Sequence, residues 1–202
     1  IYFRSDLAEA LRDYNFSSGD SFLNKLFFAS FPILILGFFF RHLISENLRT
    51  LDIIAISTIF FGLLLWVADR TSSKNPSNES ISFRHAFLIG LAQCLALIPG
   101  TSRSAITIIC ALFLSYSRVI ASKFAFMLAV PTLSIIFLSE IVSLNFSSLT
   151  TDWFDIVLVF VFSFLSSYLC IGLFLKLIER IGFTPFVIYR IILGGFLLFL
   201  AY

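Results

Sequence analysis

The chain has 202 residues and a formal net charge of +2, and 59% of its residues are hydrophobic whereas only 13% are charged. A soluble domain has about 25% charged residues, so this chain has too little charge to cover a surface in water. The composition predicts one integral membrane domain over residues 1–202. No basic patch interleaved with aromatic residues is present, which argues against nucleic acid as a partner.

The chain begins at Ile1 with a short stretch that resembles the end of an apolar helix running into a charged loop. A signal peptide would instead show a charged start, an apolar stretch and then small residues. We therefore expect that an N-terminal segment precedes this sequence.

Apolar runs free of charge follow along the chain and predict an all-α, polytopic bundle of membrane-spanning helices. A hydrocarbon core of about 30 Å requires roughly 20 residues of helix, and flanking residues extend several runs to that length. The last run can begin near Phe183. The runs are Leu26–Phe40, Ile53–Ala68, Ala86–Ser102, Ser104–Ser117, Phe124–Ser139, Ile156–Leu175 and Ile191–Tyr202.

Two interpretations remain open for the stretch from Ala86 to Ser117. Its second half, Ser104–Ser117, has only 14 residues, which is short for a span. The stretch is either a re-entrant helix–turn–helix that enters the membrane and returns, or two short tilted helices that meet at an interfacial turn.

Positive charge predicts the orientation, because cytoplasmic loops are enriched in Lys and Arg. Alternate loops contain ten cations against two, Arg41 and Arg49, and the first set is expected in the cytoplasm. The ten are Arg4, Arg12, Lys25, Arg70, Lys74, Arg84, Arg118, Lys123, Lys176 and Arg180.

A weak internal repeat relates the residues around Pro32 to those around Pro131, each inside an apolar run. Repeated, broken helices are typical of membrane proteins built from two inverted halves. The repeat predicts two superposable units of opposite orientation, although the pattern on its own is better explained by two unrelated proline kinks.

Cysteine and histidine give no sign of a disulfide framework or a zinc site. Cys94, Cys110 and Cys170 are odd in number and lie inside apolar runs, as small buried hydrophobic residues do. His42 and His85 each adjoin an arginine at the end of an apolar run, so we expect interfacial residues rather than ligands.

The most informative stretch is residues 99–107, a hydroxyl-rich turn with one arginine inside an apolar run. Pro99 and Gly100 can end one helix, and Thr101 or Ser102 can cap the next. The free N–H groups of a helix N-terminus attract anions, and the guanidinium of Arg103 matches phosphate oxygens. The residues expected at this site are Gln93, Gly100, Thr101, Ser102, Arg103, Ser104 and Thr107.

A simpler structural explanation stands beside this one. Arg103 could extend its charged end to the membrane interface while the hydroxyl groups only bond the preceding helical turn. An ionisable residue inside a membrane nevertheless indicates a functional site by default.

The stretch from Gln93 to Thr107 resembles a signature of the undecaprenyl-diphosphatase family, the bacterial membrane phosphatases linked to bacitracin resistance. The family pattern P-G-x-S-R-S-x-x-T is matched at every specified position. The resemblance continues through residues 126–131 and through Pro185–Arg190, and covers essentially the whole chain.

The resemblance implies an enzyme of the bacterial plasma (inner) membrane that hydrolyses undecaprenyl diphosphate to undecaprenyl phosphate and phosphate, recycling the carrier lipid for peptidoglycan synthesis. It implies six spanning helices and two re-entrant pairs in inverted repeats. Arg103 and Ser102 would be catalytic, with Arg103 on the diphosphate. Gly100 and Thr101 would form the turn, and Ser104, Thr107 and Gln93 would bind substrate.

One departure is that the family's N-terminal signature, E-x-x-x-E followed by P-V-S-S and a histidine, is not found here. Roughly sixty residues of the family pattern would be absent, and with them the expected ligands of a divalent cation, Mg²⁺ or Ca²⁺. No metal ligand is assigned in this chain, and residues 1–202 alone are expected to be inactive. A homodimer is one of the oligomeric states left open.

Two rival functions differ in class. The acid-phosphatase-like lipid phosphatases require S-R-x₅-H-x₃-D, and this pattern fails after both Arg103 and Arg118. A transporter for an anion or a lipid phosphate would use the same broken helix without cleaving its ligand. Paired glutamates and a histidine upstream would favour hydrolysis.

Overall fold

The computed structural model describes residues 2–12, 21–72, 80–143 and 153–202, and the regular elements in this part of the chain are helices. The α-helices are α1 (Arg4–Arg12), α2 (Phe22–Asn47), α3 (Leu51–Thr71), α4 (Phe83–Gln93), α5 (Arg103–Phe113), α6 (Arg118–Ser143), α7 (Trp153–Ile181) and α8 (Thr184–Ala201), and the 3₁₀-helix η1 covers Cys94–Leu97.

Five of the described helices (α2, α3, α6, α7 and α8) are long and apolar enough to cross a membrane. This confirms the expected all-α polytopic bundle. The remaining two apolar elements, α4 with η1 and α5, are shorter and form a hairpin. The last long helix begins at Thr184, so the expected start near Phe183 is confirmed.

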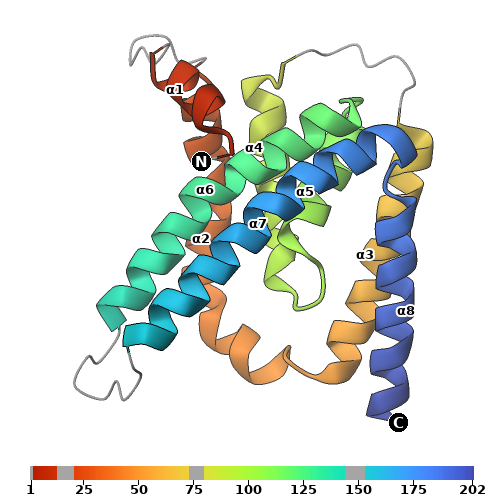
Figure 1. Cartoon of the computed structure of the whole chain (residues 1–202). Helices are drawn as coiled ribbons and strands as arrows, with labels where there is room; N and C mark the ends of the chain where they lie inside the picture. Colours follow the sequence, from red (N-terminus) through yellow and green to blue (C-terminus); the bar gives the residue numbers. More distant parts are fainter. Residues whose placement is uncertain (1, 13–20, 73–79, 144–152) are drawn as a thin grey trace.

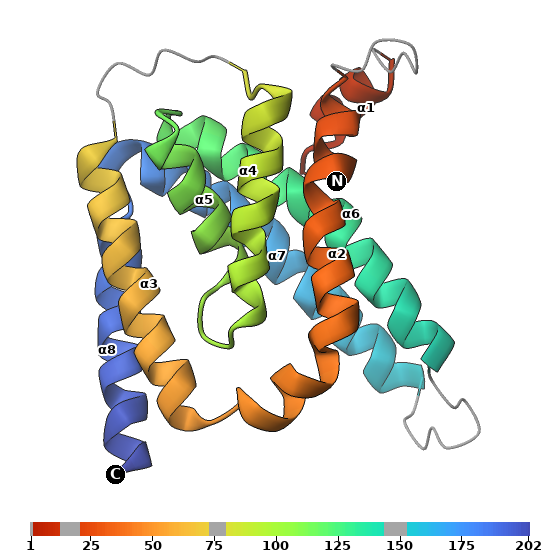
Figure 2. The same cartoon turned by 180° about the vertical axis from the view of Figure 1, so that it is seen from behind.

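The hairpin enters and leaves the bundle at the same end, where α3 ends and α6 begins (Figures 1 and 2). Its turn lies part of the way along the length of α3 and α8. The described cations of the expected cytoplasmic set lie at or near that end, because α1, the start of α2 and the α7–α8 turn are also there. The side chain of Arg41 and residue Lys74 lie outside the described parts.

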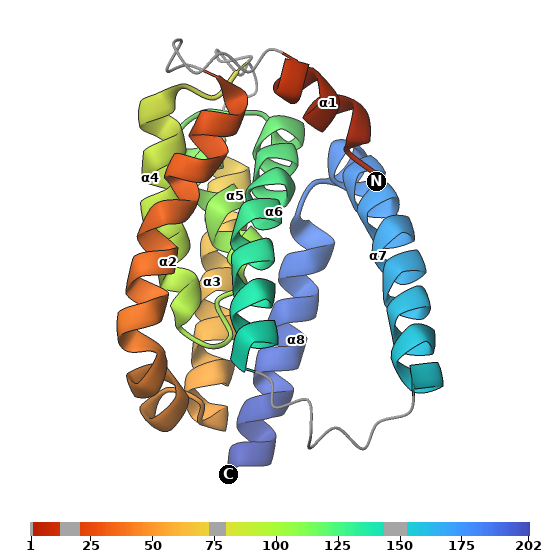
Figure 3. The ribbon, with the colours of Figure 1, turned by 90° about the vertical axis from the view of Figure 1, so that its left-hand side faces the viewer.

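The expected opposite orientation of the units containing Pro32 and Pro131 is wrong. Both prolines lie inside helices of 26 residues, α2 and α6, but the two helices run in the same direction (Figure 3). The reason is the hairpin of α4 and α5. Helix α3 runs opposite to α2, and the hairpin then starts and ends on the same side of the bundle. Helix α6 therefore begins where α3 ended and runs in the direction of α2. An inverted repeat of some other pairing stays a prediction.

Burial divides the helices into an inner and an outer group. Helix α5 is buried along most of its length, between α3, α4 and α6. Most of α7 is exposed, with Ile178 near its end as its buried residue, and α7 stands apart from α8 (Figure 3). Because α5 begins at the turn of the hairpin, the turn is fixed by the best-packed part of the molecule.

Close backbone contacts hold the hairpin in place. Helix α4 packs against α2 so closely that a Cβ added at Gly90 would lie 2.7 Å from the Cα of Ala29. No side chain fits between the two backbones there, so glycine is required by the close approach.

An ion pair ties three elements together at the end where the hairpin enters. The Nε of Arg118, at the start of α6, donates to Oδ1 of Asp69 at 2.6 Å, and the backbone N–H of Phe183 donates to Oδ2 at 3.2 Å. Asp69 is almost fully buried, so both partners are needed to compensate its charge.

Candidate functional site: the turn between two broken helices

The helix break expected at Pro99–Ser104 is confirmed. The α-helical part of the first arm ends at Gln93, the 3₁₀-helix ends at Leu97, and α5 begins at Arg103. Gly100 has φ +90°, a conformation that side-chain-bearing residues rarely adopt, and a Cβ there would lie 2.9 Å from Oγ1 of Thr58. Glycine is therefore needed both for the backbone angle and for the close approach to α3.

Ser102 is the N-cap of α5, one of the two alternatives that the sequence offered. Its Oγ accepts a hydrogen bond from the backbone N–H of Ala105 at 3.4 Å, and lies 3.4 Å from Oγ of Ser104. The φ of Ser102 is +69°, which is unfavourable for a residue with a side chain and costs about 1–3 kcal/mol. The side chain is exposed, so its hydroxyl group is accessible to a ligand.

The turn is held from behind by side chains of α3 and α8. Ser57 donates to the carbonyl oxygen of Pro99, and Thr58 donates to that of Gly100 at 3.3 Å. Arg190 donates from Nη2 to the carbonyl oxygens of Gly100 at 2.6 Å and of Thr101 at 3.0 Å.

Sequence analysis did not assign Ser57, Thr58 or Arg190 to the site. Two signals for Arg190 were present: it is a cation within an apolar run, which inside a membrane indicates a polar partner, and it ends the stretch Pro185–Arg190 that resembles the family. Ser57 and Thr58 gave no signal, because a serine or threonine in an apolar helix usually bonds its own preceding turn.

Three expected site residues have buried polar atoms with no hydrogen-bond partner among the described residues: Nε2 of Gln93, Oγ1 of Thr101 and Nη1 of Arg103. Gln93 and Thr101 are essentially inaccessible, with exposed fractions of 1% and 0%. Buried polar groups in native proteins almost always have a partner, so each exception requires an explanation. All three atoms are inaccessible in this structure, so a polar ligand would reach them only after side chains at the turn move.

Thr107 makes the contacts that the simpler structural explanation expected. Its buried hydroxyl group donates to the carbonyl oxygens of Arg103 at 3.1 Å and Ser104 at 3.0 Å, in its own helix. Its contact with phosphate stays a prediction, and would require this hydroxyl group to turn.

The geometry as a whole suits an anion. The exposed N-cap, the first amide groups of an 11-residue helix and the guanidinium of Arg103 bring positive and donating groups to one turn. Ser102 and Ser104 add hydroxyl donors. The hydrogen bonds of Ser102 involve Ser104 and Ala105, neither of which is a general base.

The same residues do not suit Mg²⁺ or Ca²⁺. These ions bind carboxylate and carbonyl oxygens. The carbonyl oxygens of the turn already accept hydrogen bonds from α3 and α8, and the turn otherwise contributes guanidinium, amide and hydroxyl groups. Among the described residues, no group of three or more His, Cys, Asp or Glu could hold a metal ion.

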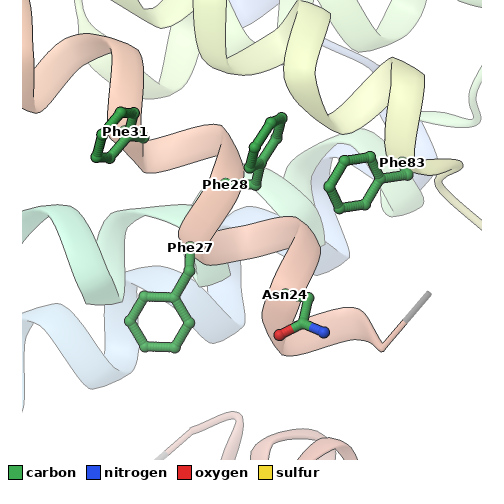
Figure 4. Close-up of a pocket in the computed structure, with 5 residues that line it drawn as sticks. All are labelled: Asn24, Phe27, Phe28, Phe31 and Phe83. Carbon is green, nitrogen blue, oxygen red and sulfur yellow. The ribbon is translucent and has the colours of Figure 1, made fainter. Parts of the chain in front are cut away.

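An open pocket of about 470 Å³ lies elsewhere, between α2 and α4 (Figure 4). In the close-up, the rings of Phe28 and Phe83 lie side by side, with their centroids 4.7 Å apart, and Asn24 is the polar member of the lining. It shares no residue with the expected site and is not evidence for it.

The side chains of the cysteines and of His85 make none of the described hydrogen bonds to residues 99–107. All three cysteines are free thiols. Nδ1 of His85, in the first turn of α4, lies 2.7 Å from the hydroxyl oxygen of Tyr116. The side chain of His42 lies outside the described part.

Comparisons of the sequence with known proteins point to one family. Residues 1–196 match the family model described as bacitracin resistance protein BacA. The chain is 42% identical over 209 aligned residues to the undecaprenyl-diphosphatase of Alteromonas mediterranea, covering 100% of this chain and 79% of the relative. It is 41% identical to undecaprenyl-diphosphatase 1 of Pseudoalteromonas translucida, again over 100% and 79% of the two chains, and 40% identical to the Campylobacter curvus undecaprenyl-diphosphatase, over 99% and 78%.

Proposed function

Because the chain belongs to the BacA bacitracin resistance family, we propose that it hydrolyses undecaprenyl diphosphate to undecaprenyl phosphate and phosphate. The names of its relatives support the activity. We further propose that it is a multi-pass protein of the bacterial inner membrane, with the hairpin of α4 and α5 as a re-entrant element.

The observation that carries this proposal is the N-terminus of α5, where the exposed N-cap Ser102 and the guanidinium-bearing Arg103 lie at one turn. Arg103 offers Nη1 and Gln93 offers Nε2, both without a partner in the described structure. A diphosphate has only acceptor oxygens, so it satisfies such donors and gains from the N-terminus of α5.

In this proposal the chief role of the turn is to stabilise negative charge on the reacting phosphoryl group. Water attacks the terminal phosphorus, the bond to the bridging oxygen breaks, and undecaprenyl phosphate leaves. Negative charge grows on the phosphoryl oxygens and on the leaving oxygen, and donors fixed in advance stabilise it. Arg103 and Ser102 would contact the reacting group, while Ser104 and Thr101 would orient it.

The turn contributes no general base, so we propose that this group comes from outside the described residues. Residues 1–202 alone would then bind the lipid diphosphate without releasing phosphate. The relatives are longer than this chain, and a general base could lie in the part of them that this chain does not cover.

The test is phosphate release from undecaprenyl diphosphate in detergent, by residues 1–202 and by the whole gene product. Release by the whole product that is lost in Arg103→Ala supports the proposal. Retained release in Arg103→Ala refutes the site. Binding of the lipid without release by the whole product favours the transporter, and flux of lipid phosphate in vesicles would then be measured.

A further inference from the structure

Arg190 is a cation on an apolar helix, and its hydrogen bonds all go to backbone carbonyl oxygens. Besides the two bonds from Nη2 to the turn, Nε donates to the carbonyl oxygen of Thr58 at 3.2 Å. A guanidinium offers five donors in a fixed plane, which allows one side chain to bridge α3 and the turn. Arg190 therefore joins α8, α3 and the hairpin at one point.

The bond to Thr101 has a geometric consequence for the next amide group. A trans peptide is planar, with its C=O and its N–H pointing in opposite directions. When Arg190 holds the carbonyl oxygen of Thr101, the N–H of Ser102 is directed away from Arg190. None of the described hydrogen bonds uses that N–H as a donor, so it remains available to a ligand.

The same bond lies next to the strained residue of the turn. Ser102 has an unfavourable φ of +69°, and such a conformation persists only where its surroundings determine it. Charge-assisted hydrogen bonds are about twice as strong as neutral ones. Two of them, from Arg190 to the residues just before Ser102, can hold the backbone there.

From these contacts we propose that Arg190 is a positioning residue. Its guanidinium fixes the carbonyl groups of Gly100 and Thr101, and thereby directs the N–H of Ser102 and the first turn of α5 toward a phosphate group. The identity of that phosphate as part of a lipid diphosphate rests on the proposed function, but the positioning role does not.

A merely structural role for Arg190 makes a different prediction. The bond to Thr58 links α8 to α3, and a cross-link of this kind would affect only the stability of the bundle. Positioning affects the reaction and the binding of phosphate in molecules that are still folded. The two roles are separated by measuring both.

The experiment compares Arg190→Lys and Arg190→Ala in the whole gene product, with Arg180→Lys and Arg180→Ala as matched controls. Arg180 is exposed in the last turn of α7. The measurements are kcat and KM for undecaprenyl diphosphate, and the rise in unfolding temperature caused by inorganic phosphate. Millimolar guanidinium or ammonium is then added to Arg190→Ala.

We expect kcat of Arg190→Lys to fall by about ten- to a hundredfold, because small misplacements of a site cost this much. KM should change less, and the phosphate-dependent rise in unfolding temperature should be lost. Guanidinium should restore kcat to Arg190→Ala, whereas ammonium should restore it less, since only a planar fork donates at once to the two carbonyl oxygens of the turn and to that of Thr58. The Arg180 variants should match the wild type.

Unchanged kcat and an unchanged response to phosphate in folded Arg190→Lys would overturn the positioning role. A loss of stability alone, with normal kcat per folded molecule, would also overturn it. If Arg190→Ala does not fold, Arg190→Lys decides. If the wild type releases no phosphate but its response to inorganic phosphate depends on Arg190, the proposed function fails while the positioning role stands.

Discussion

Replacing Arg103 with lysine separates charge from geometry at the turn. The Nη1 of Arg103 has no hydrogen-bond partner among the described residues, so the substitution removes no bond from that atom to the folded protein. Lysine keeps the positive charge but is a point charge, and cannot offer two parallel donors to a pair of phosphate oxygens. We therefore expect little change in stability and a large change in turnover.

The magnitude follows from the loss of one fixed donor in the transition state. Removal of such a donor costs on the order of a hundredfold in kcat, or about 2.7 kcal/mol. Arg103→Ala, which loses the charge as well, should be slower still. The assay is phosphate release from undecaprenyl diphosphate by the whole gene product in detergent, normalised to folded protein.

Arg118→Lys is the matched control because its arginine has the opposite environment. It loses the 2.6 Å bond from Nε to buried Asp69, and a hydrogen bond to a charged group contributes about 1.5–3 kcal/mol. Stability should fall while turnover per folded molecule is kept. If Arg103→Lys retained nearly wild-type turnover, the arginine would supply only charge and the argument from paired donors would be refuted.

Three further substitutions test the packing and the turn. Gly90→Ala should destabilise the protein by about 1–3 kcal/mol through collision with the backbone of Ala29, whereas Gly195→Ala, which meets nothing within 4 Å, should be neutral in thermal unfolding. Gly100→Ala forces a side chain onto a φ of +90°, so we expect a loss of about 1–3 kcal/mol and lower turnover, and normal values of both would contradict the tight turn. Ser104→Ala removes one neutral hydrogen bond worth about 1 kcal/mol, so kcat/KM should fall only about fivefold, and a hundredfold loss would indicate a direct role in the reaction.

The sequence by itself determined the class of the fold and the place of the helix break. A chain in which 13% of the residues are charged has too little charge to cover a surface in water. A helix in lipid is also broken at Pro99 and Gly100 and at the hydroxyl-bearing residues that follow. These are local consequences of residue type, which is why the break follows from the sequence alone, whereas the structure chose Ser102 over Thr101 as the cap.

Only the tertiary structure decided which side chains bind the carbonyl groups of the turn, and in which directions α2 and α6 run. Ser57, Thr58 and Arg190 are 42 to 90 residues from the carbonyl groups that they hold, and no periodicity connects them. The parallel course of α2 and α6 likewise depends on a hairpin that returns to its own side. Residue type limits the local conformation of a segment. The hydrogen-bond partner of a buried polar group is instead selected by packing between helices that are distant in sequence, because it depends on which backbones can approach closely.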